Sequence, residues 1–169
     1  LYNNGRDDIA LFYFKEGANY ATLTTTNSIV SETITWNEKS NKKMVKALLV
    51  NTKNANTFTG KQGYDSIETV AKSLAKNLTL RESKKEEGIS ETVKIKDLIF
   101  ASTGVIGETF PVDLITNSIE NLVSKLRDDQ NKLIWIKTAS AIMTTDTKPK
   151  LAYEEFTFNN KIIRIAAIA

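Results

Sequence analysis

The stretch IKDLIFASTGVIG, residues 95–107, joins an apolar segment to a turn that contains two glycines. Its first part, Ile95–Phe100, predicts a short buried strand, and Gly104 and Gly107 predict a sharp turn directly after that strand. Such a turn can direct backbone N–H groups and a hydroxyl at one point, which is the arrangement that stabilises a developing oxyanion. Glycine-flanked turns after strands are common and mostly structural, so this interpretation depends on the rest of the chain.

Length and composition are those of one soluble globular domain. The chain has 169 residues, of which 41% are hydrophobic and 25% are charged, and a chain of this size can bury a sizeable core. No apolar run approaches the roughly 18 residues that a membrane span needs. Residues 1–8 also lack the charged and apolar regions of a signal peptide. We therefore expect a cytoplasmic protein with no membrane partner.

Cysteine and histidine are both missing from the sequence. Their absence excludes disulfides, thiolate nucleophiles, Ser–His and Cys–His catalysis and the usual zinc sites. Any nucleophile is therefore a Ser, Thr, Lys or carboxylate, and we expect no metal. The 23 basic residues are interspersed with 20 acidic ones, for a net charge of +3. Such a mixed-charge surface argues against a nucleic-acid partner.

The first half of the chain predicts strands followed by an amphipathic helix. Ile9–Lys15 and Tyr20–Thr26 are β-prone runs with the spacing of a hairpin, whereas Ser28–Ile34 begins either a helix or a strand. Val45–Val50 is a continuous apolar run that predicts a buried strand. Tyr64–Leu80 carries apolar residues at intervals of three and four, which predicts a helix packed against a sheet.

The second half alternates in the same way. A charged surface connection is expected over Arg81–Glu91, before the strand at Lys94–Phe100. The remaining predicted elements are helices at Pro111–Arg127 and Lys132–Met143 and a terminal hairpin of Leu151–Phe158 with Lys161–Ala169. Because strand–helix units alternate with hairpins, the order predicts one layered α/β domain with a mixed sheet over residues 1–169.

Three loops concentrate small hydroxyl, amide or glycine residues after a regular element. They are Asn51–Gly63, Ser102–Gly107 and Thr144–Thr147. Loops at the same ends of neighbouring elements can converge on one crevice in layered α/β domains. For the first loop, turn-forming chemistry is favoured over the alternative of direct ligand contact. In the third loop, Asp146 either accepts backbone hydrogen bonds or acts as a base.

Other candidate motifs favour structural roles. The first loop lacks the Gly-Lys-Ser/Thr ending of a P-loop, and the second lacks the dinucleotide-binding fingerprint. The carboxylates of Glu32, Glu108 and Asp113 show no pairing in the sequence, and the last two suit the start of a helix. Trp36 and Trp135 are interpreted as packing aromatics rather than stacking platforms.

Three long motifs, in order along the chain, closely resemble one family. They are KALLVNTKNANTFTGKQG from Lys46, FASTGVIGETFP from Phe100 and AIMTTDTKPK from Ala141. Together they are similar to the α chain of the bifunctional ornithine acetyltransferase/N-acetylglutamate synthase family of arginine biosynthesis. The resemblance covers most of the chain. It implies a self-processing acetyltransferase fold that is similar to that of the N-terminal-nucleophile enzymes.

The resemblance also implies a chemistry. Members are made as one precursor that cuts itself before a threonine, which becomes the N-terminal nucleophile of a β chain. That threonine takes acetyl from N2-acetylornithine and passes it to glutamate in a ping-pong reaction, with its own α-amine able to serve as the base. The resemblance implies no resident cofactor, although some members use acetyl-CoA as a donor substrate. The implied partner is the β chain, in a heterotetramer of two α and two β chains.

The family's motifs assign roles to four residues of this chain. Thr103 and Gly104 match the Thr-Gly pair that forms the oxyanion hole through a hydroxyl and a backbone N–H. A substrate-binding threonine of the family falls on Thr144, with Thr145 as the second choice. No catalytic role carries over to the Asn51–Gly63 loop.

The sequence departs from the family in three places. Both ends are expected to be truncated relative to the family's α chain, with a substrate-binding lysine expected directly after Ala169. Thr52 and Lys53 stand where the family typically has Ser-Gly, so the geometry of this loop is in question. Two alternatives stay open at this point: a non-catalytic small-molecule-binding module of the same fold, and a self-processing amidohydrolase.

Overall fold

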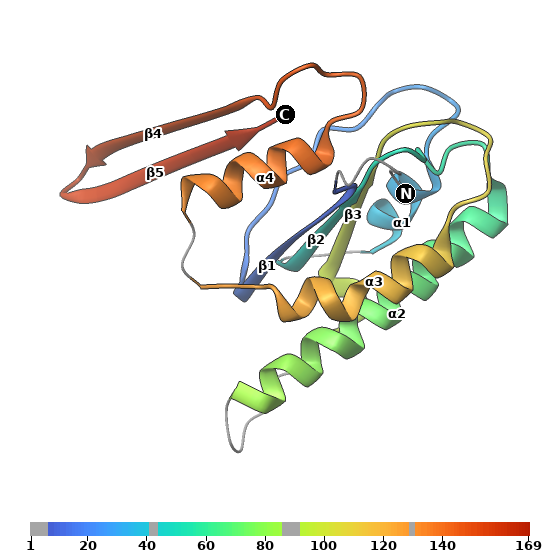
Figure 1. Ribbon diagram of the computed structural model, residues 1–169, viewed down its shortest axis with the longest axis horizontal. Coiled ribbons are helices and arrows are strands. Elements are labelled where there is room, and N and C mark those ends of the chain that lie inside the picture. Colours follow the sequence, from blue (N-terminus) through green and yellow to red (C-terminus); the bar gives the residue numbers. More distant parts are fainter. Residues whose placement is uncertain (1–6, 41–43, 86–91, 129–130) are drawn as a thin grey trace.

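A computed structural model describes residues 7–40, 44–85, 92–128 and 131–169. Figure 1 shows a central sheet with helices on both sides and a separate hairpin. The elements in chain order are β1 (Ile9–Ala18), α1 (Glu32–Lys39), β2 (Val45–Asn51), α2 (Gly60–Lys85), a 3₁₀ turn (Ile95–Asp97), β3 (Leu98–Ser102), α3 (Val112–Ser124), α4 (Lys132–Ile142), β4 (Leu151–Phe158) and β5 (Lys161–Ile168).

The central sheet is mixed, with strand order β1-β2-β3. β1 pairs antiparallel with β2, and β2 pairs parallel with β3 so that Asn51 lies opposite Ser102. The parallel strands are joined through α2, because a parallel connection must cross back over the sheet. Two loops therefore leave the sheet side by side at the carboxyl ends of β2 and β3. This confirms the predicted layered α/β architecture.

The main core lies between the sheet and the helix pair α2 and α3. Figure 1 shows the two helices running along the same side of the sheet. Each presents buried aliphatic residues at intervals of three or four, as an amphipathic helix requires, and they meet alternate residues of β2 and β3. The fully buried aliphatic side chains of this layer include Ala47, Ile67, Val70, Leu74, Leu78, Leu98, Ile115 and Ile119.

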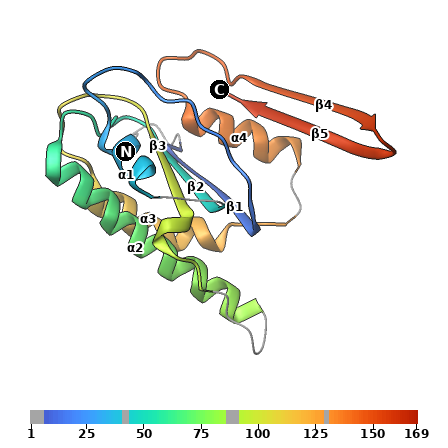
Figure 2. The same ribbon diagram turned by 180° about the vertical axis from the view of Figure 1, so that it is seen from behind.

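The opposite side of the sheet is covered by α4, beyond which lies the β4–β5 hairpin (Figure 2). The ring of Trp135 packs against that of Phe12, with centroids 6.2 Å apart. Every residue of β4 is exposed, including Tyr153 and Phe156 at about half of their full accessible area. Within the described residues, the hairpin is thus a two-stranded ribbon with little apolar cover, an arrangement that is marginally stable on its own.

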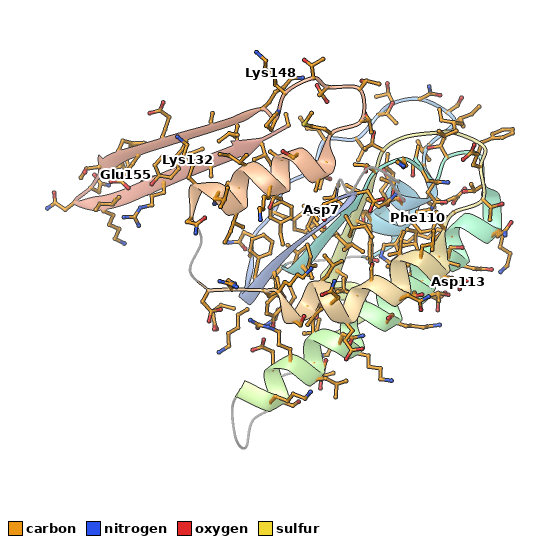
Figure 3. The ribbon with its side chains drawn as sticks, in the orientation of Figure 1. Asp7, Phe110, Asp113, Lys132, Lys148 and Glu155 are labelled. Atoms are coloured by element: carbon orange, nitrogen blue, oxygen red, sulfur yellow. The ribbon has the colours of Figure 1, made fainter. Side chains whose placement is uncertain are left out.

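A cross-strand ion pair lies on the outer half of this hairpin, where Figure 3 marks Glu155. Arg164 Nε donates to Glu155 Oε2 at 2.8 Å. This hydrogen bond, with a second from the Tyr153 hydroxyl, lowers the pKa of Glu155. The pair is exposed, so it helps to fix the strand register rather than adding much stability.

Helix α1 protects the edge of the sheet. Asn37 Nδ2 donates to the Phe100 carbonyl at 2.7 Å, and the Phe100 N–H donates to Asn37 Oδ1 at 3.0 Å. The amide therefore pairs with β3 as a neighbouring strand would, which occupies part of an otherwise open edge. Trp36, on the same helix, packs on Phe100 and Tyr64. The predicted packing roles of Trp36 and Trp135 are confirmed.

The predicted hairpin of Ile9–Lys15 with Tyr20–Thr26 is wrong. β1 continues to Ala18 and pairs with β2, and Gly17, at φ +79°, serves an irregularity within this pairing instead of a turn. The second run forms no strand, and Leu23 within it is fully exposed. Local β propensity was overridden because β2 supplied a better partner for β1.

Three predicted boundaries also shift. Ser28–Ile34, for which the sequence left a helix or a strand open, contains the start of a helix. This helix begins after Ser31, whose hydroxyl accepts a hydrogen bond from the Thr33 N–H. α2 begins at Gly60 and runs to Lys85, so part of the expected charged connection is helical, and residues 86–91 lie outside the described residues. Strand β3 begins at Leu98, because the preceding residues form the 3₁₀ turn. The other predicted helices and the C-terminal hairpin are confirmed.

Asn37→Ala is expected to lower the free energy of unfolding by about 1–3 kcal/mol, since it leaves the N–H and carbonyl of Phe100 without their partners. Urea unfolding followed by circular dichroism measures the change. Glu38→Ala, on the exposed face of the same helix, is the matched control and should change stability by less than about 0.5 kcal/mol. Equal effects of the two substitutions would contradict the edge-pairing role.

Candidate functional site

The pairing of β2 and β3 continues into the loops that follow them. The Thr103 N–H donates to the Asn51 carbonyl at 3.0 Å, and the Val105 N–H donates to the Lys53 carbonyl at 2.9 Å. The Ala55 N–H then donates to the Val105 carbonyl at 2.9 Å. The glycine turn is consequently held on the neighbouring loop as if both strands had been extended. Its position is set by backbone hydrogen bonds and does not depend on long side chains.

Buried asparagines hold the first loop together. Asn51 Nδ2 donates to the Asn54 carbonyl at 2.9 Å, while Asn51 Oδ1 accepts from Ser102 Oγ at 2.7 Å. Asn54 Nδ2 reaches the carbonyls of Glu108 and Thr109. Asn56 donates to Gly63, and all three asparagines are at most 5% exposed. Because their amides are used within the protein, the predicted turn-forming role of this loop is confirmed.

Gly104 lies where the two loops touch. Its φ is +137°, and a Cβ at this position would lie 2.1 Å from the carbonyl carbon of Lys53 and 2.5 Å from the Asn54 nitrogen. Both neighbours are backbone atoms that the sheet holds in place. Only glycine fits this contact, because any side chain would separate the two loops. The close approach explains why this turn needs its first glycine.

Lys53 occupies the other side of this contact in a left-handed conformation, with φ +73°. The sequence raised a question about the loop because lysine lacks the conformational freedom of glycine. In the structure Lys53 nonetheless adopts the left-handed region, and the hydrogen bond from the Val105 N–H to its carbonyl holds it there. Non-glycine residues rarely adopt this region, and its free-energy cost is roughly 1–2 kcal/mol.

The two loops form one wall of a cleft of about 670 Å³. The segment after α4 forms the other, through Thr144 and Thr145. The cleft therefore brings together three segments that lie between 41 and 91 positions apart in the chain, counted between Lys53, Thr103 and Thr144. It contains all four residues that the sequence singled out. The lining residues are Lys53, Asn54, Thr103, Gly104, Val105, Glu108, Thr109, Pro111, Thr144 and Thr145.

Two hydrogen-bond donors of the turn are free to face a ligand. The Thr103 N–H is already bonded to Asn51, which leaves the hydroxyl of Thr103 as its available donor. Among the residues that the structure describes, neither that hydroxyl nor the Gly104 N–H has a hydrogen-bond partner. A hydroxyl and an adjacent N–H on a rigid turn can stabilise negative charge that develops on a carbonyl oxygen.

Other candidates from the sequence lie outside this arrangement. Asp146 forms an ion pair with Lys150 and is absent from the cleft lining. Asp113 lies in the first turn of α3, where Figure 3 marks it near Phe110, and a carboxylate there complements the helix dipole. Across the described ranges, no group of three or more acidic residues could hold a metal ion. In those same ranges, no helix is both long and apolar enough to cross a membrane.

Sequence reasoning gave no role at this site to two charged lining residues, Lys53 and Glu108. The sequence shows only that Lys53 follows a buried strand, and the structure adds that the parallel neighbour of this strand carries the glycine turn. For Glu108 the sequence predicts only a residue that favours the start of a helix. Their approach to the cleft depends on the loop pairing, which no local pattern predicts.

The chain combines a layered α/β fold with a cleft in which a glycine turn faces a threonine pair. Comparison with known proteins identifies the family of proteins to which this combination belongs. Residues 2–169 match the ArgJ family. The chain is 33% identical over its whole length to the arginine biosynthesis bifunctional protein ArgJ of Caulobacter vibrioides. It is 29% identical over 99% of its length to glutamate N-acetyltransferase of Methanocaldococcus jannaschii. The chain belongs to the ArgJ family.

Solved structures agree with this fold. The crystal structure of arginine biosynthesis bifunctional protein ArgJ from Bacillus halodurans superposes with a TM-score of 0.82 and 25% identity, over 99% of this chain and 80% of that one. Ornithine acetyltransferase from Mycobacterium tuberculosis, crystallised with ornithine, gives a TM-score of 0.77. The chain spans 39% of the Caulobacter relative and 38% of the Methanocaldococcus relative.

Gly104→Ala should lower the free energy of unfolding by at least about 2 kcal/mol, because the added methyl group would overlap the backbone of the neighbouring loop. Urea unfolding measures the loss. Gly107→Ala is the matched control: its φ of +81° is also unfavourable for alanine, but a Cβ there meets nothing within 4 Å. A similar loss from both substitutions would show that backbone conformation alone, and not the close contact, requires Gly104.

Proposed function

We propose that this chain forms the α-chain part of an acetyltransferase that moves acetyl from N2-acetylornithine to glutamate. One observation carries the proposal: the cleft joins the free donors of Thr103 and Gly104 to the threonine pair Thr144 and Thr145. Membership of the ArgJ family and the names of its relatives support the same activity. The nucleophile, a threonine at the start of a β chain, lies outside these 169 residues.

In the first half-reaction, the hydroxyl oxygen of the β-chain threonine attacks the acetyl carbonyl carbon of N2-acetylornithine. Its proton passes to the threonine's own α-amine. The carbonyl oxygen becomes an oxyanion, which accepts hydrogen bonds from the Thr103 hydroxyl and the Gly104 N–H. The C–N bond then breaks and the proton moves to the departing amine. Ornithine is released, and the acetyl group remains on the threonine as an ester.

In the second half-reaction, the amine of glutamate attacks this ester through the same tetrahedral geometry. The threonine oxygen leaves and recovers a proton, and N-acetylglutamate is released. The same pair of donors serves both steps, because both intermediates place negative charge on the same oxygen. Thr144 contributes a hydroxyl that holds the substrate, with Thr145 as the second choice. No resident cofactor is required, and acetyl-CoA would act only as an alternative donor.

Exposed apolar side chains of the described chain also support a β chain as its partner. The β4–β5 hairpin presents apolar side chains on both strands, including Phe158 and Ile162 at about 60% exposure. The chain also spans well under half of the relatives it matches. A β chain from the same precursor would cover part of this surface and complete the cleft. We further propose a cytoplasmic heterotetramer of two α and two β chains.

The direct test is an assay of acetyl transfer from N2-acetylornithine to glutamate, using this chain alone and coexpressed with the remainder of its precursor. Transfer is expected from the coexpressed protein only. Release of free acetate without transfer would identify a hydrolase, and ligand binding without either reaction would identify a binding module. Robust transfer by the isolated chain would overturn the division of labour between the two chains.

Thr103→Ala should lower kcat for transfer by about 10²–10³-fold, the usual effect of losing one oxyanion donor. Steady-state kinetics of the coexpressed protein measure the loss, and precursor cleavage should slow as well. Thr103→Ser retains the hydroxyl and is the control, with activity close to that of the wild type. Unchanged rates of transfer and cleavage in Thr103→Ala would remove the oxyanion role.

Thr144→Ala should raise KM for N2-acetylornithine by about 2- to 13-fold, since it removes one neutral hydrogen bond of about 0.5–1.5 kcal/mol. Thr147→Ala is the control, because Thr147 belongs to the same run but does not line the cleft. A larger effect from Thr145→Ala than from Thr144→Ala would assign the substrate contact to the second-choice residue.

A further inference from the structure

Lys53 combines an unfavourable backbone conformation with a place in the cleft. Its φ of +73° lies in the left-handed region, which disfavours residues with a Cβ. The residue is half-buried and lines the cleft with Thr103 and Gly104. Backbone strain concentrates at functional sites because the surrounding structure can hold it there. None of the steps of the proposed acetyl transfer uses this residue.

The backbone of Lys53 cannot move away from the oxyanion turn. Its carbonyl accepts the Val105 N–H at 2.9 Å, and the Cβ position of Gly104 lies 2.1 Å from its carbonyl carbon. The start of the Lys53 side chain is therefore held beside the turn that would bind the acetyl oxygen. A lysine ammonium on a flexible stem is a mobile point charge that suits a carboxylate.

The proposed substrates carry a carboxylate at a matching distance. In N2-acetylornithine, three bonds separate the acetyl carbonyl carbon from the α-carboxylate carbon, and their lengths total about 4.3 Å. Glutamate carries the same α-carboxylate beside the amine that attacks. Whichever substrate is bound, its α-carboxylate must lie close to the oxyanion turn. Lys53 and Glu108 are the charged residues lining the described part of the cleft, and only Lys53 is a cation.

We infer that Lys53 is a specificity-determining residue whose ammonium binds the α-carboxylate shared by the donor and the acceptor. This inference rests on the proposed acetyl transfer and adds the substrate group that the site selects. Lys53 takes no part in proton transfer or in stabilising the oxyanion. Its contribution is to bind amino acids that carry a free α-carboxylate in preference to simple amines and amides.

The test replaces Lys53 with Met in the coexpressed protein and compares two acetyl donors. One is N2-acetylornithine, and the other is N-acetyl-1,4-diaminobutane, which is the same molecule without its carboxylate. Lys53→Met should raise KM for N2-acetylornithine and for glutamate by about 10-fold or more, as loss of a charge-assisted hydrogen bond implies. The kcat should stay within about 2-fold, and kcat/KM for the carboxylate-free donor should not change.

Three further variants separate charge from structure. Lys53→Arg keeps the cation and should restore most of the affinity. Lys53→Gly removes the charge while relieving the left-handed strain, so it should be at least as stable as the wild type and still show the raised KM. Lys76→Met makes the same change on the exposed face of α2 and should leave KM unaltered.

Unchanged KM values in Lys53→Met and Lys53→Gly, or equal losses with both donors, would overturn the carboxylate assignment while leaving acetyl transfer intact. Equal losses of kcat/KM with the two donors would mean that Lys53 shapes the cleft without binding the carboxylate. Absence of transfer by the wild-type coexpressed protein would instead overturn the proposed function, and the assignment with it. The two failures are distinguished by the wild-type measurement alone.

Discussion

The contact between Gly104 and the backbone of Lys53 is the constraint on which the candidate site depends. Parallel pairing of β2 and β3 brings two loops out of the sheet at the same end, and hydrogen bonds from Thr103 and Val105 keep the loops paired beyond the strands. The approach is close enough to exclude a Cβ at position 104. The turn is thereby rigid before any ligand arrives.

Rigidity matters for the proposed oxyanion role, because such a site works through donors that need no rearrangement during the reaction. Buried asparagines supply it by satisfying the polar groups of the first loop, as Asn51 does with Ser102 and Asn54. The same network extends to α1, since Ser102 also hydrogen-bonds to Thr33. The loops are consequently continuous with the packed domain, and the hydroxyl of Thr103 and the N–H of Gly104 are left for the cleft.

The described chain has two parts that differ in how well their apolar side chains are buried. Its sheet, α2 and α3 enclose a well-packed core, whereas β4 and β5 expose aromatic and aliphatic side chains along both strands. An exposed apolar ribbon of this size is unusual for a self-sufficient domain. This agrees with a chain that spans only part of its relatives.

Local patterns in the sequence determined most of the elements. Periodicity located α2, α3, α4, β2 and the C-terminal hairpin, and the absence of histidine and cysteine by itself restricted the nucleophile to a hydroxyl, an amine or a carboxylate. The candidate threonines and Gly104 came from the resemblance of long motifs to a family. The tertiary structure decided the rest, because strand pairing and close backbone contacts join residues that are distant in the chain. It paired β1 with β2 in place of the local hairpin, brought Thr103 and Thr144 to one cleft, and placed Lys53 in a conformation that its residue type disfavours.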